Sequence, residues 1–340
     1  MPLDYDKRLQ NLSTRRFDNE LNESVLSKSF SNYNIPKNIK YLMESMSKID
    51  NKYNEKTIEA ANRVKNHLER DFNLHFDRAY KTQGSVTTAT NIKVHSDFDL
   101  LTIIDRYHYN SIDIPNNNPY TESDPDIDIK DLRKQSEQIM KSIYDDVDTT
   151  GKKNISIFNK SLNRKVDIVF CFWYNSKEYE DSKNEYYRGV YLYDFTTNNK
   201  ILDYPFAHIY QVNQKGDRTN DGSRKGIRLL KNIKVDSDQE INLSSFHITT
   251  IVHSIDDDLI KYYTGNELDI AKTVSFQLQR LIIDPTYRKS IKSPNGTEKP
   301  LTDDTVDDIK KIKKDLDELI SDIGREVYYD YFKNKQLIYS

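Results

Sequence analysis

Residues 83–101 read QGSVTTATNIKVHSDFDLL, and this stretch carries the pattern from which the fold class is inferred. It holds a Gly-Ser turn at Gly84 and Ser85 and, after a spacer, the aspartates Asp97 and Asp99. From the first aspartate onward the residues are rich in β-branched and aromatic side chains, which predicts a short strand that runs into a core. Because successive side chains of a strand point to opposite faces, the two aspartates share one face.

Two carboxylates on one face of a strand repel each other unless a cation lies between them. Mg²⁺ prefers carboxylate oxygens, waters and phosphates as ligands, so Asp97 and Asp99 are candidates for a divalent-metal site. The backbone N–H groups and the hydroxyl of the Gly84-Ser85 turn suit phosphate oxygens. The simpler interpretation is a surface turn followed by an edge strand with two solvated aspartates. A third aspartate further along the chain favours the metal site.

That third aspartate interrupts the most apolar strand that the sequence predicts. Residues 165–172 read KVDIVFCF, with Asp167 among apolar side chains. A buried aspartate without a partner is costly, so it must be paired, hydrogen-bonded or bound to a metal. A salt bridge to a neighbouring Arg or Lys would satisfy it. With Asp97 and Asp99 available, we favour an acidic triad around two Mg²⁺ ions, which would activate a hydroxyl and stabilise a departing pyrophosphate.

The composition limits the classes of protein to which the chain can belong. Its 340 residues are enough for one large or two ordinary domains. The net charge is −3, whereas a protein that coats nucleic acid is usually positive. A single cysteine, Cys171, excludes an internal disulfide framework and suits a reducing cytoplasm. We find no apolar run long enough for a membrane span, and the charges throughout residues 1–18 argue against a signal peptide.

Apolar residues at helical spacing predict several helices around these strands. Residues 4–30 are expected to form a first, loosely packed helix. A long spine helix, kinked near Asn51, is expected to follow Pro36 from about residue 37 to residue 70. Further helices are expected over 126–146, 244–255, 266–283 and 303–325. Strands are expected over 76–82, 97–104, 155–158, 165–172 and 188–195. One long loop is expected around the helix breakers Pro285, Pro294, Gly296 and Pro300.

Two segments allow more than one interpretation. The acidic cluster in residues 122–131 could be a calcium loop, but it lacks the central glycine and the terminal glutamate of an EF-hand. We therefore favour a helix start, where acids are stabilised by the helix dipole. Tyr191, Tyr193 and Phe195 alternate along a strand and would serve equally as a stack for a nucleotide base or as ordinary core.

A basic helix follows the acidic strands. Arg224, Arg228 and Lys231 are spaced i, i+4 and i+7 and hence share one face, while Ile227 and Leu230 can face a core. Such a face suits a polyphosphate, which arginine can bind through two N–H groups at once. A solvated helix surface is the alternative. The order of acidic strands followed by a basic helix favours phosphate binding.

The Gly-Ser turn, the spacer, Asp97-x-Asp99 and Asp167 on a later strand together resemble the polymerase-β-like nucleotidyltransferase superfamily. Within it, the chain resembles the bacterial cGAS/DncV-like nucleotidyltransferases (CD-NTases), the signalling cyclases of CBASS antiphage systems. The narrower resemblance is carried by GIRLLKNIK at 226–234, SSFHITTIV at 244–252 and Asp284-Pro285. It covers roughly residues 40–325.

This resemblance implies an α+β fold with two lobes and an active site in the cleft between them. One is a polymerase-β-like nucleotidyltransferase lobe, a mixed twisted sheet with flanking helices and the long N-terminal spine helix. The other is a C-terminal helical lobe that closes the nucleotide cleft. We expect an N-terminal helical segment at 1–35, the catalytic lobe at 36–205 and the helical lobe at 206–340.

The resemblance also implies an enzyme that makes a cyclic di- or trinucleotide second messenger from NTPs, with release of pyrophosphate, in antiphage defence. By the same resemblance, the donor triphosphate is bound by Gly84, Ser85, Arg228, Lys231 and Ser245. The expected catalytic residues, which would also bind two Mg²⁺ ions that Mn²⁺ can replace, are Asp97, Asp99 and Asp167.

The expected partners are NTP substrates, regulatory proteins of a CBASS operon and a downstream effector reached through the nucleotide product. We expect a cytoplasmic protein that binds neither membranes nor nucleic acid stably. Two alternatives stay open. One is a toxin-type nucleotidyltransferase that modifies tRNA or protein, and the other is a non-catalytic nucleotide-binding scaffold.

Overall fold

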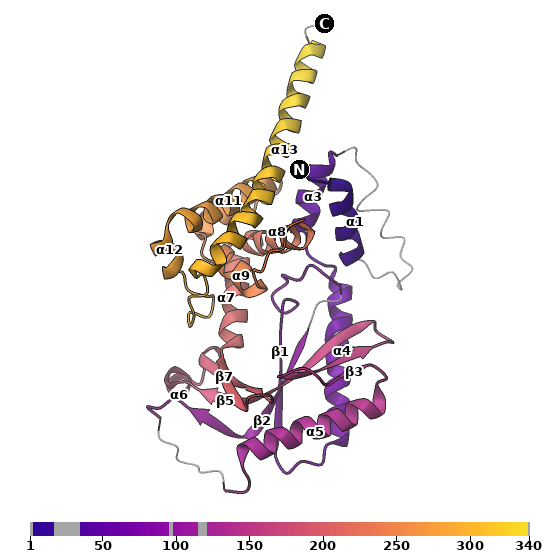
Figure 1. The fold of residues 1–340 in the computed structure, drawn as a ribbon, viewed down its shortest axis with the longest axis vertical. Helices are drawn as coiled ribbons and strands as arrows, with labels where there is room; N and C mark the ends of the chain where they lie inside the picture. Colours follow the sequence, from indigo (N-terminus) through magenta and orange to yellow (C-terminus); the bar gives the residue numbers. More distant parts are fainter. Residues whose placement is uncertain (1–2, 17–34, 95–97, 115–120, 339–340) are drawn as a thin grey trace. The chain divides into compact units, whose positions relative to one another are not determined.

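Seven strands form one mixed sheet within the residues that the structure describes. The structure is a computed structural model that describes residues 3–16, 35–94, 98–114 and 121–338, with side chains to residue 327 (Figure 1). The two central strands, β2 and β5, are parallel neighbours, and the other described pairs are antiparallel. The strands are β1 (Arg78–Gln83), β2 (Asp99–Asn110), β3 (Val147–Asp148), β4 (Asn154–Asn159), β5 (Arg164–Asn175), β6 (Arg188–Asp194) and β7 (Asn199–Asp203).

The chain divides into two compact units. The sheet unit comprises Asp50–Ala89 and His95–Gln211 and holds all seven described strands. The helical unit comprises Met1–Ile49, Thr90–Val94 and Val212–Ser340. The short segment Thr90–Val94 thus belongs to the helical unit, although the chain before it and after it belongs to the sheet unit.

One face of the sheet is covered by two helices, α4 (Asn51–Asp71) and α5 (Pro125–Ile143) (Figure 1). From the two central strands, the core beneath these helices includes Leu100, Ile104, Ile168, Phe170 and Phe172. A smaller cluster includes Leu101, Ile103, Val169 and Cys171. Because strand side chains alternate, this cluster lies on the opposite face, and Asp99 and Asp167 lie on that face with it. The alternation that buries one face therefore presents both aspartates on the other.

The expected spine helix is two helices rather than one. α3 (Lys37–Met46) ends where Ser47 becomes extended, and α4 begins after Asp50. The Asp50 side chain accepts a hydrogen bond from the Lys52 backbone N–H, which satisfies a donor that a new helix start leaves open. The kink expected near Asn51 is therefore a full break. The boundary between the two units falls at the same place, because α3 belongs to the helical unit and α4 to the sheet unit.

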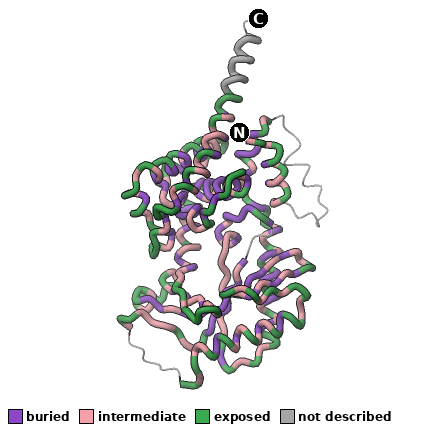
Figure 2. Tube along the Cα trace, viewed as in Figure 1, coloured by how far each residue is buried: buried purple, intermediate pink, exposed green. Residues whose placement is uncertain are grey.

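The helical unit is built around α8 (Gly222–Asp236), most of whose residues are buried (Figure 2). The helices that pack against α8 include α3, α9 (Ser245–His253), α11 (Glu267–Ile283) and α13 (Val306–Ile338). The other described helices of this unit are α1 (Tyr5–Arg16), α10 (Asp257–Ile260) and α12 (Pro285–Ser290), with a 3-10 turn at Asp303–Thr305. α7 (Pro205–Arg218) spans the boundary at residues 211 and 212. α6 (Lys177–Ser182) and a second 3-10 turn (Glu185–Tyr187) belong to the sheet unit.

The end of α1 and the start of α12 bear on two sequence predictions. α1 ends at Arg16, and the rest of the helix expected over residues 4–30 lies outside the described residues. Pro285 does not lie in a loop, because it starts α12. The Asp284 side chain caps this helix by accepting a hydrogen bond from the Tyr287 N–H at 2.8 Å, and a first-turn proline has no N–H that would need a partner. The expected loop is therefore shorter than predicted.

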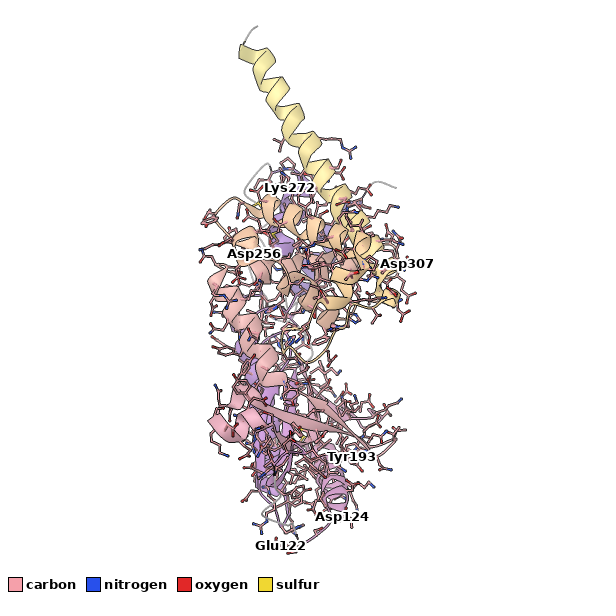
Figure 3. All side chains as sticks on the ribbon, turned by 90° about the vertical axis from the view of Figure 1, so that its left-hand side faces the viewer. Glu122, Asp124, Tyr193, Asp256, Lys272 and Asp307 are labelled. Carbon is pink, nitrogen blue, oxygen red and sulfur yellow. The ribbon has the colours of Figure 1, made fainter. Side chains whose placement is uncertain are left out.

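The acidic cluster before α5 is a helix start, as favoured from the sequence. The Asp124 side chain accepts hydrogen bonds from the backbone N–H groups of Asp126 and Ile127. Glu122, which lies near it in Figure 3, pairs with Arg106. Asp128 is buried, with His75 at 3.6 Å. None of the helices described is both long enough and apolar enough to cross a membrane.

Candidate active site

Asp99 and Asp167 lie side by side at the centre of the sheet. They are register partners on the parallel strands β2 and β5 and share the face opposite the one that α4 and α5 cover. The predicted juxtaposition of these two carboxylates is therefore present. Asp97, the third member of the predicted triad, lies outside the described residues, so its participation stays a prediction.

Neutral side chains from the neighbouring strands hold both carboxylates. Gln83, the register partner of Asp99 on β1, donates from Nε2 to Asp99 Oδ2 at 2.9 Å. Ser156, the register partner of Asp167 on β4, donates from Oγ to Asp167 Oδ1. These residues form a polar row across four adjacent strands, in the order Gln83, Asp99, Asp167, Ser156. Each donor binds one oxygen of its carboxylate without neutralising the charge.

One cation also approaches this row. Lys165, two residues before Asp167 on β5, donates from Nζ to Asp167 Oδ2 at 3.4 Å. The Lys165 side chain is 41% exposed, so the pair is partly solvated and contributes little to stability. The salt bridge that the sequence left open as an alternative is thus present, but it is long and its lysine is partly exposed.

The polar row contains residues that the sequence prediction missed. Gln83 was assigned to no role, although it directly precedes the Gly-Ser turn. Ser156 stands between Ile155 and Ile157, where the alternation places it on the face opposite those two apolar residues. A single polar residue between two apolar residues of a strand was the feature of the sequence that could have indicated Ser156. Its significance depends on the pairing of β4 with β5, which the sequence does not reveal.

The donor set fits a divalent cation. Two carboxylates in adjacent register positions supply hard oxygen ligands, and Asp97 precedes Asp99 by two residues. Among the residues that the structure describes, no group of three or more Asp, Glu, His or Cys side chains is placed to hold a metal. The described part of the site therefore supplies a pair of carboxylates. A third carboxylate would have to come from Asp97.

The Gly-Ser turn lies directly beside these carboxylates. β1 ends at Gln83, opposite Asp99, so Gly84 and Ser85 follow at the same end of the strand pair. Gly84 has a φ of 115°, which residues with a Cβ rarely adopt, and the Thr87 N–H closes the turn on its carbonyl at 3.2 Å. The turn requires glycine and leads the chain away from the polar row. This placement agrees with the expected phosphate-binding role, which stays a prediction.

The helical unit contains the candidate cations. Lys231 on α8 is 7% exposed and donates from Nζ to the Thr90 carbonyl at 3.1 Å and to Thr90 Oγ1 at 3.4 Å. Burial, with a smaller contribution from the charge of Arg228, lowers the pKa of Lys231 to about 8. Both oxygens are neutral, so these contacts orient the ammonium group without cancelling its charge.

Arg228, one turn earlier on α8, is engaged inside the helical unit. Its side chain is 1% exposed and donates from Nε to the Met46 carbonyl at 2.6 Å and from a terminal nitrogen to Asp221 at 2.5 Å. Burial lowers the pKa of Arg228, against the opposing effect of Asp221. The solvated surface considered as an alternative does not apply to Arg228 or Lys231. To bind a phosphate, Arg228 would have to release one of these partners.

Ser245 is the exposed first residue of α9. The preceding Ser244 caps the helix, because its Oγ accepts from the His247 N–H and its N–H donates to His247 Nδ1, each at 3.1 Å. Ser244 is engaged in this capping box, whereas the hydroxyl of Ser245 lies exposed at the positive end of the helix dipole. The position suits an anion. Binding of a triphosphate there stays a prediction.

The aromatic strand belongs to the core. Tyr193 is fully buried, and its ring lies 4.9 Å from that of Phe195 and 6.2 Å from that of Phe172. Tyr191 packs edge-to-face on Tyr109 at 5.4 Å. The core interpretation therefore holds for Tyr193. Cys171, on the face with the aspartates, is buried, and burial raises the pKa of its thiol, which makes it a poor nucleophile.

The sheet with its paired aspartates is the catalytic architecture of a nucleotidyltransferase, and solved structures of that class match it. A STING-associated CdnE c-di-GMP synthase from Capnocytophaga granulosa aligns with a TM-score of 0.80 and 31% identity, over 95% of this chain and 99% of that one. A STING-associated CdnE c-di-GMP synthase from Flavobacteriaceae sp. aligns with a TM-score of 0.81 and 25% identity, over 95% and 99%. The predicted polymerase-β-like α+β fold is confirmed.

Sequence relatives narrow the class to a family, although no protein-family model matches the chain. The cyclic dinucleotide synthase CdnE from Yersinia aleksiciae is 30% identical, over 97% of this chain and 93% of its own length. A c-di-GMP synthase from Capnocytophaga granulosa is 32% identical, over 93% and 95%. The chain therefore belongs to the CdnE cyclic dinucleotide synthases, a group of CD-NTases, and is a nucleotidyltransferase. The predicted family and enzyme class are confirmed.

Proposed function

We propose that this enzyme joins two molecules of GTP into cyclic di-GMP and releases two molecules of pyrophosphate. The observation that carries the chemistry is the register pair Asp99 and Asp167 on the face of the sheet opposite α4 and α5, beside the Gly-Ser turn. The choice of guanine rests on relatives. Proteins named c-di-GMP synthase from Capnocytophaga granulosa and a Lachnospiraceae bacterium are 32% and 34% identical to this chain.

The acidic residues would bind the metal. We propose that Asp99 and Asp167, joined by Asp97, hold two Mg²⁺ ions, which when bound would assist the attacking hydroxyl and offset charge on the phosphates. Gln83 and Ser156 fix the orientation of the two carboxylates from either side of the row. Such outer partners usually affect metal affinity as well as ligand geometry. Lys165 can leave Asp167 for solvent, because their contact is long and the Lys165 side chain is partly exposed.

The other candidate residues would bind the triphosphate of the donor nucleotide. We assign backbone N–H groups of Gly84 and Ser85, the ammonium group of Lys231 and the hydroxyl of Ser245 to this role. A triphosphate near Lys231 would stabilise its charged form and thereby raise its depressed pKa. Arg228 is assigned a supporting role, since its contacts with Met46 and Asp221 hold α8 in place. Most of the rate would then come from positioning and charge stabilisation.

The test is to incubate purified enzyme with each NTP alone and with all pairs, in Mg²⁺ or Mn²⁺, and to identify phosphatase-resistant products by mass spectrometry. The expected product is cyclic di-GMP from GTP alone. The Asp167→Asn protein, checked for folding by circular dichroism, should form none. A mixed or pyrimidine product would refute the base assignment while supporting the reaction class. No pyrophosphate release with any NTP would refute the proposed function for the isolated enzyme.

We further propose that the product acts in the cytoplasm, where NTPs are made, through an effector that recognises the cyclic dinucleotide. The relatives from Capnocytophaga granulosa and Flavobacteriaceae sp. are described as STING-associated, which supports a receptor of that kind. A role in antiphage defence and contacts with regulatory proteins of a CBASS operon stay predictions. Binding of labelled product by an effector encoded beside this chain, with no binding of the linear dinucleotide, would support this proposal.

A further inference from the structure

Asn154, the first residue of β4, extends the polar row by one contact. Its Nδ2 donates to Ser156 Oγ at 3.2 Å, and Ser156 in turn donates to Asp167 Oδ1. Asn154 and Ser156 are two positions apart on one strand, so both side chains lie on the face of the sheet that carries Asp167. Ile155 and Ile157 belong instead to the core on the opposite face. All five residues lie within the sheet unit.

The contact with Asn154 determines where the Ser156 hydroxyl points. A serine hydroxyl has a single proton and can rotate, so it can donate in several directions unless a second partner limits the rotation. The NH₂ group of Asn154 only donates, so the Ser156 proton is left for Asp167. A hydroxyl that accepts a hydrogen bond also becomes a better donor, because hydrogen bonds in a chain polarise one another. Asn154 therefore directs and strengthens the bond between Ser156 and Asp167.

The loop before β4 packs directly against Asn154. A Cβ atom on Gly151 would lie 2.3 Å from Asn154 Oδ1 and 2.8 Å from the Asn154 carbonyl oxygen, so only glycine allows this close approach. Arg133 on α5 holds the same loop, because one terminal nitrogen donates to the carbonyls of Thr149 and Gly151, each at 2.8 Å. The Arg133 guanidinium in turn lies 4.4 Å from the centre of the Phe195 ring. The Asn154 side chain is thus confined between a fixed loop and the Ser156 hydroxyl.

We propose that Asn154 is a positioning residue for nucleotidyl transfer, which acts through the Ser156 hydroxyl on the metal-binding carboxylate of Asp167. Ser156 engages Oδ1 of that carboxylate, so Oδ2, with its long contact to Lys165, is the oxygen that can turn to a metal. Without the Asn154 donor the Ser156 hydroxyl can rotate away, and Asp167 loses a fixed orientation. This inference rests on the proposed function, because it requires that Asp167 binds metal. The alternative is that Asn154 only stabilises the start of β4.

The first variant is Asn154→Leu, which removes the donor and keeps a side chain of similar shape. Mn²⁺ affinity is measured by electron paramagnetic resonance of the free ion, with a GTP analogue that has a methylene group between its α- and β-phosphorus atoms. Direct partners of a metal ligand change metal affinity about tenfold or more, and Asn154 is one contact further out, so we expect about threefold weaker binding. The Mg²⁺ concentration for half-maximal turnover should rise by the same factor. If Asn154→Leu does not fold, Asn154→Ala replaces it.

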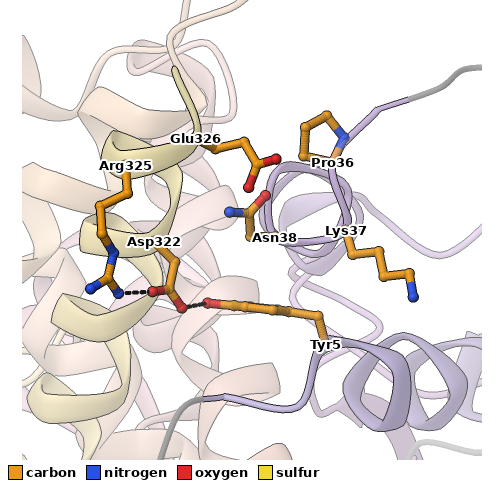
Figure 4. A pocket seen from close by; sticks show the side chains of 7 residues that line it. All are labelled: Tyr5, Pro36, Lys37, Asn38, Asp322, Arg325 and Glu326. Carbon is orange, nitrogen blue, oxygen red and sulfur yellow. Dashed lines mark hydrogen bonds and ion pairs between the residues drawn. The ribbon is translucent and has the colours of Figure 1, made fainter. Parts of the chain in front are cut away.

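A double-mutant cycle decides whether Asn154 acts through Ser156. Ser156→Ala should weaken Mn²⁺ binding about tenfold, and adding Asn154→Leu should cause no further loss, because the hydroxyl that transmits the effect is gone. The control is Tyr5→Phe, which removes a hydroxyl that donates to Asp322 at 2.5 Å in the helical unit, beside a surface pocket of about 420 Å³ (Figure 4). Tyr5→Phe should leave Mn²⁺ affinity unchanged, and Asn154→Leu should keep its full effect in that background.

Gly151→Ala displaces Asn154 without replacing it. The added Cβ would force the Asn154 side chain or its backbone to move, so Mn²⁺ binding should weaken about threefold, as in Asn154→Leu. In the Ser156→Ala background the same substitution should have no effect on Mn²⁺ affinity. Gly324→Ala is the matched control, because a Cβ at that position meets no described atom within 4 Å. It should leave Mn²⁺ affinity unchanged.

The inference is overturned if Asn154→Leu binds Mn²⁺ as the wild type does, even when its thermal stability is lower, because Asn154 would then serve the fold alone. It is also overturned if Asn154→Leu weakens Mn²⁺ binding equally in the presence and absence of the Ser156 hydroxyl. If the wild-type enzyme makes no cyclic dinucleotide, the proposed function fails, whereas the Mn²⁺ titrations still decide the role of Asn154. Absence of Mn²⁺ binding by the wild type would overturn the inference together with the assigned metal site.

Discussion

The candidate site residues of the two units differ in how their charges are held. In the sheet unit, Asp99 and Asp167 share one face and are held by the neutral donors Gln83 and Ser156. In the helical unit, Arg228 is buried and its charge is offset by Asp221. Lys165 also approaches Asp167, but their contact is long and partly solvated, so both carboxylates can accept an incoming cation, whereas the arginine is used to hold the fold. Lys231 is intermediate, because it is buried against the neutral oxygens of Thr90.

The sharpest way to break this comparison is to neutralise the acids. Asp99→Asn and Asp167→Asn should each lower turnover about a thousandfold or more, because they remove a metal ligand and the charge that attracts the ion. Stability should change little, or increase, since carboxylate repulsion is relieved. Turnover is measured by pyrophosphate release and stability by thermal unfolding. Asp71→Asn, which alters an exposed carboxylate on α4, is the control. Near-normal turnover in either active-site variant would exclude the metal site.

The neutral donors provide a smaller test of the same site. Ser156→Ala removes the hydroxyl that orients Asp167 and should lower turnover about tenfold, with a matching rise in the Mg²⁺ concentration needed for half-maximal activity. Ser142→Ala removes a hydroxyl on α5 that donates to the Ile139 carbonyl, and it should leave both values unchanged. If Ser156→Ala alters thermal stability but not the metal requirement, the hydroxyl serves the fold and not the site.

The charge of Lys231 should make both stability and NTP binding depend on pH. Its folded pKa of about 8 lies below the usual 10.5, so the unfolded chain binds more protons between these values and stability rises with pH across that window. Between pH 7.5 and 9.5 this residue should add on the order of 2 kcal/mol to the free energy of unfolding. The KM for NTP should increase over the same range, because the cation is lost.

The variant that tests this pH dependence is Lys231→Met. Its free energy of unfolding is measured with denaturant at pH 7.5 and 9.5 and compared with that of the wild type. The variant should lack this gain in stability and should show a KM that no longer depends on pH near 8. Lys225 also has a lowered pKa through burial, so only the difference between wild type and variant is assigned to Lys231. Identical pH dependence in the two proteins would contradict the buried cation.

The smallest expected effect lies away from the site. Asp124→Ala should cost about 1 kcal/mol, because it removes the cap of α5. Turnover and its metal dependence should not change. Glu122→Ala, which alters an exposed side chain in the same cluster, is the control and should be close to neutral. Stabilisation of the wild type by Ca²⁺, lost in Asp124→Ala, would instead revive the calcium-loop interpretation.

The parts of the site that could be predicted are those that depend on local patterns. The alternation in the two central strands placed Asp99 and Asp167 on strand faces, and the glycine before Ser85 marked the turn. Long-range pairing could not be predicted in the same way. Ser156 and Gln83 became visible only when β4 and β1 were placed beside the central strands.

The basic helix shows a second limit. Spacing placed Arg228 and Lys231 on one face of α8, but it does not reveal what covers that face. The tertiary structure buries both, and it gives Arg228 a carboxylate partner and Lys231 a backbone carbonyl. The break at Asp50 escaped prediction for a related reason, since apolar spacing continued across a cap that ends one helix and starts another.

The division of the chain into units also affects the order in which its parts can fold during translation. The sheet unit needs nothing beyond Gln211, so its strands can pair while later residues are still being added by the ribosome. The helical unit draws on three separate stretches, and α1 and α3 must wait for α8 before Leu12 and Tyr41 can be buried. The newly made chain therefore exposes these apolar residues for most of its translation, and the nascent N-terminal helices are where we expect chaperones to bind first.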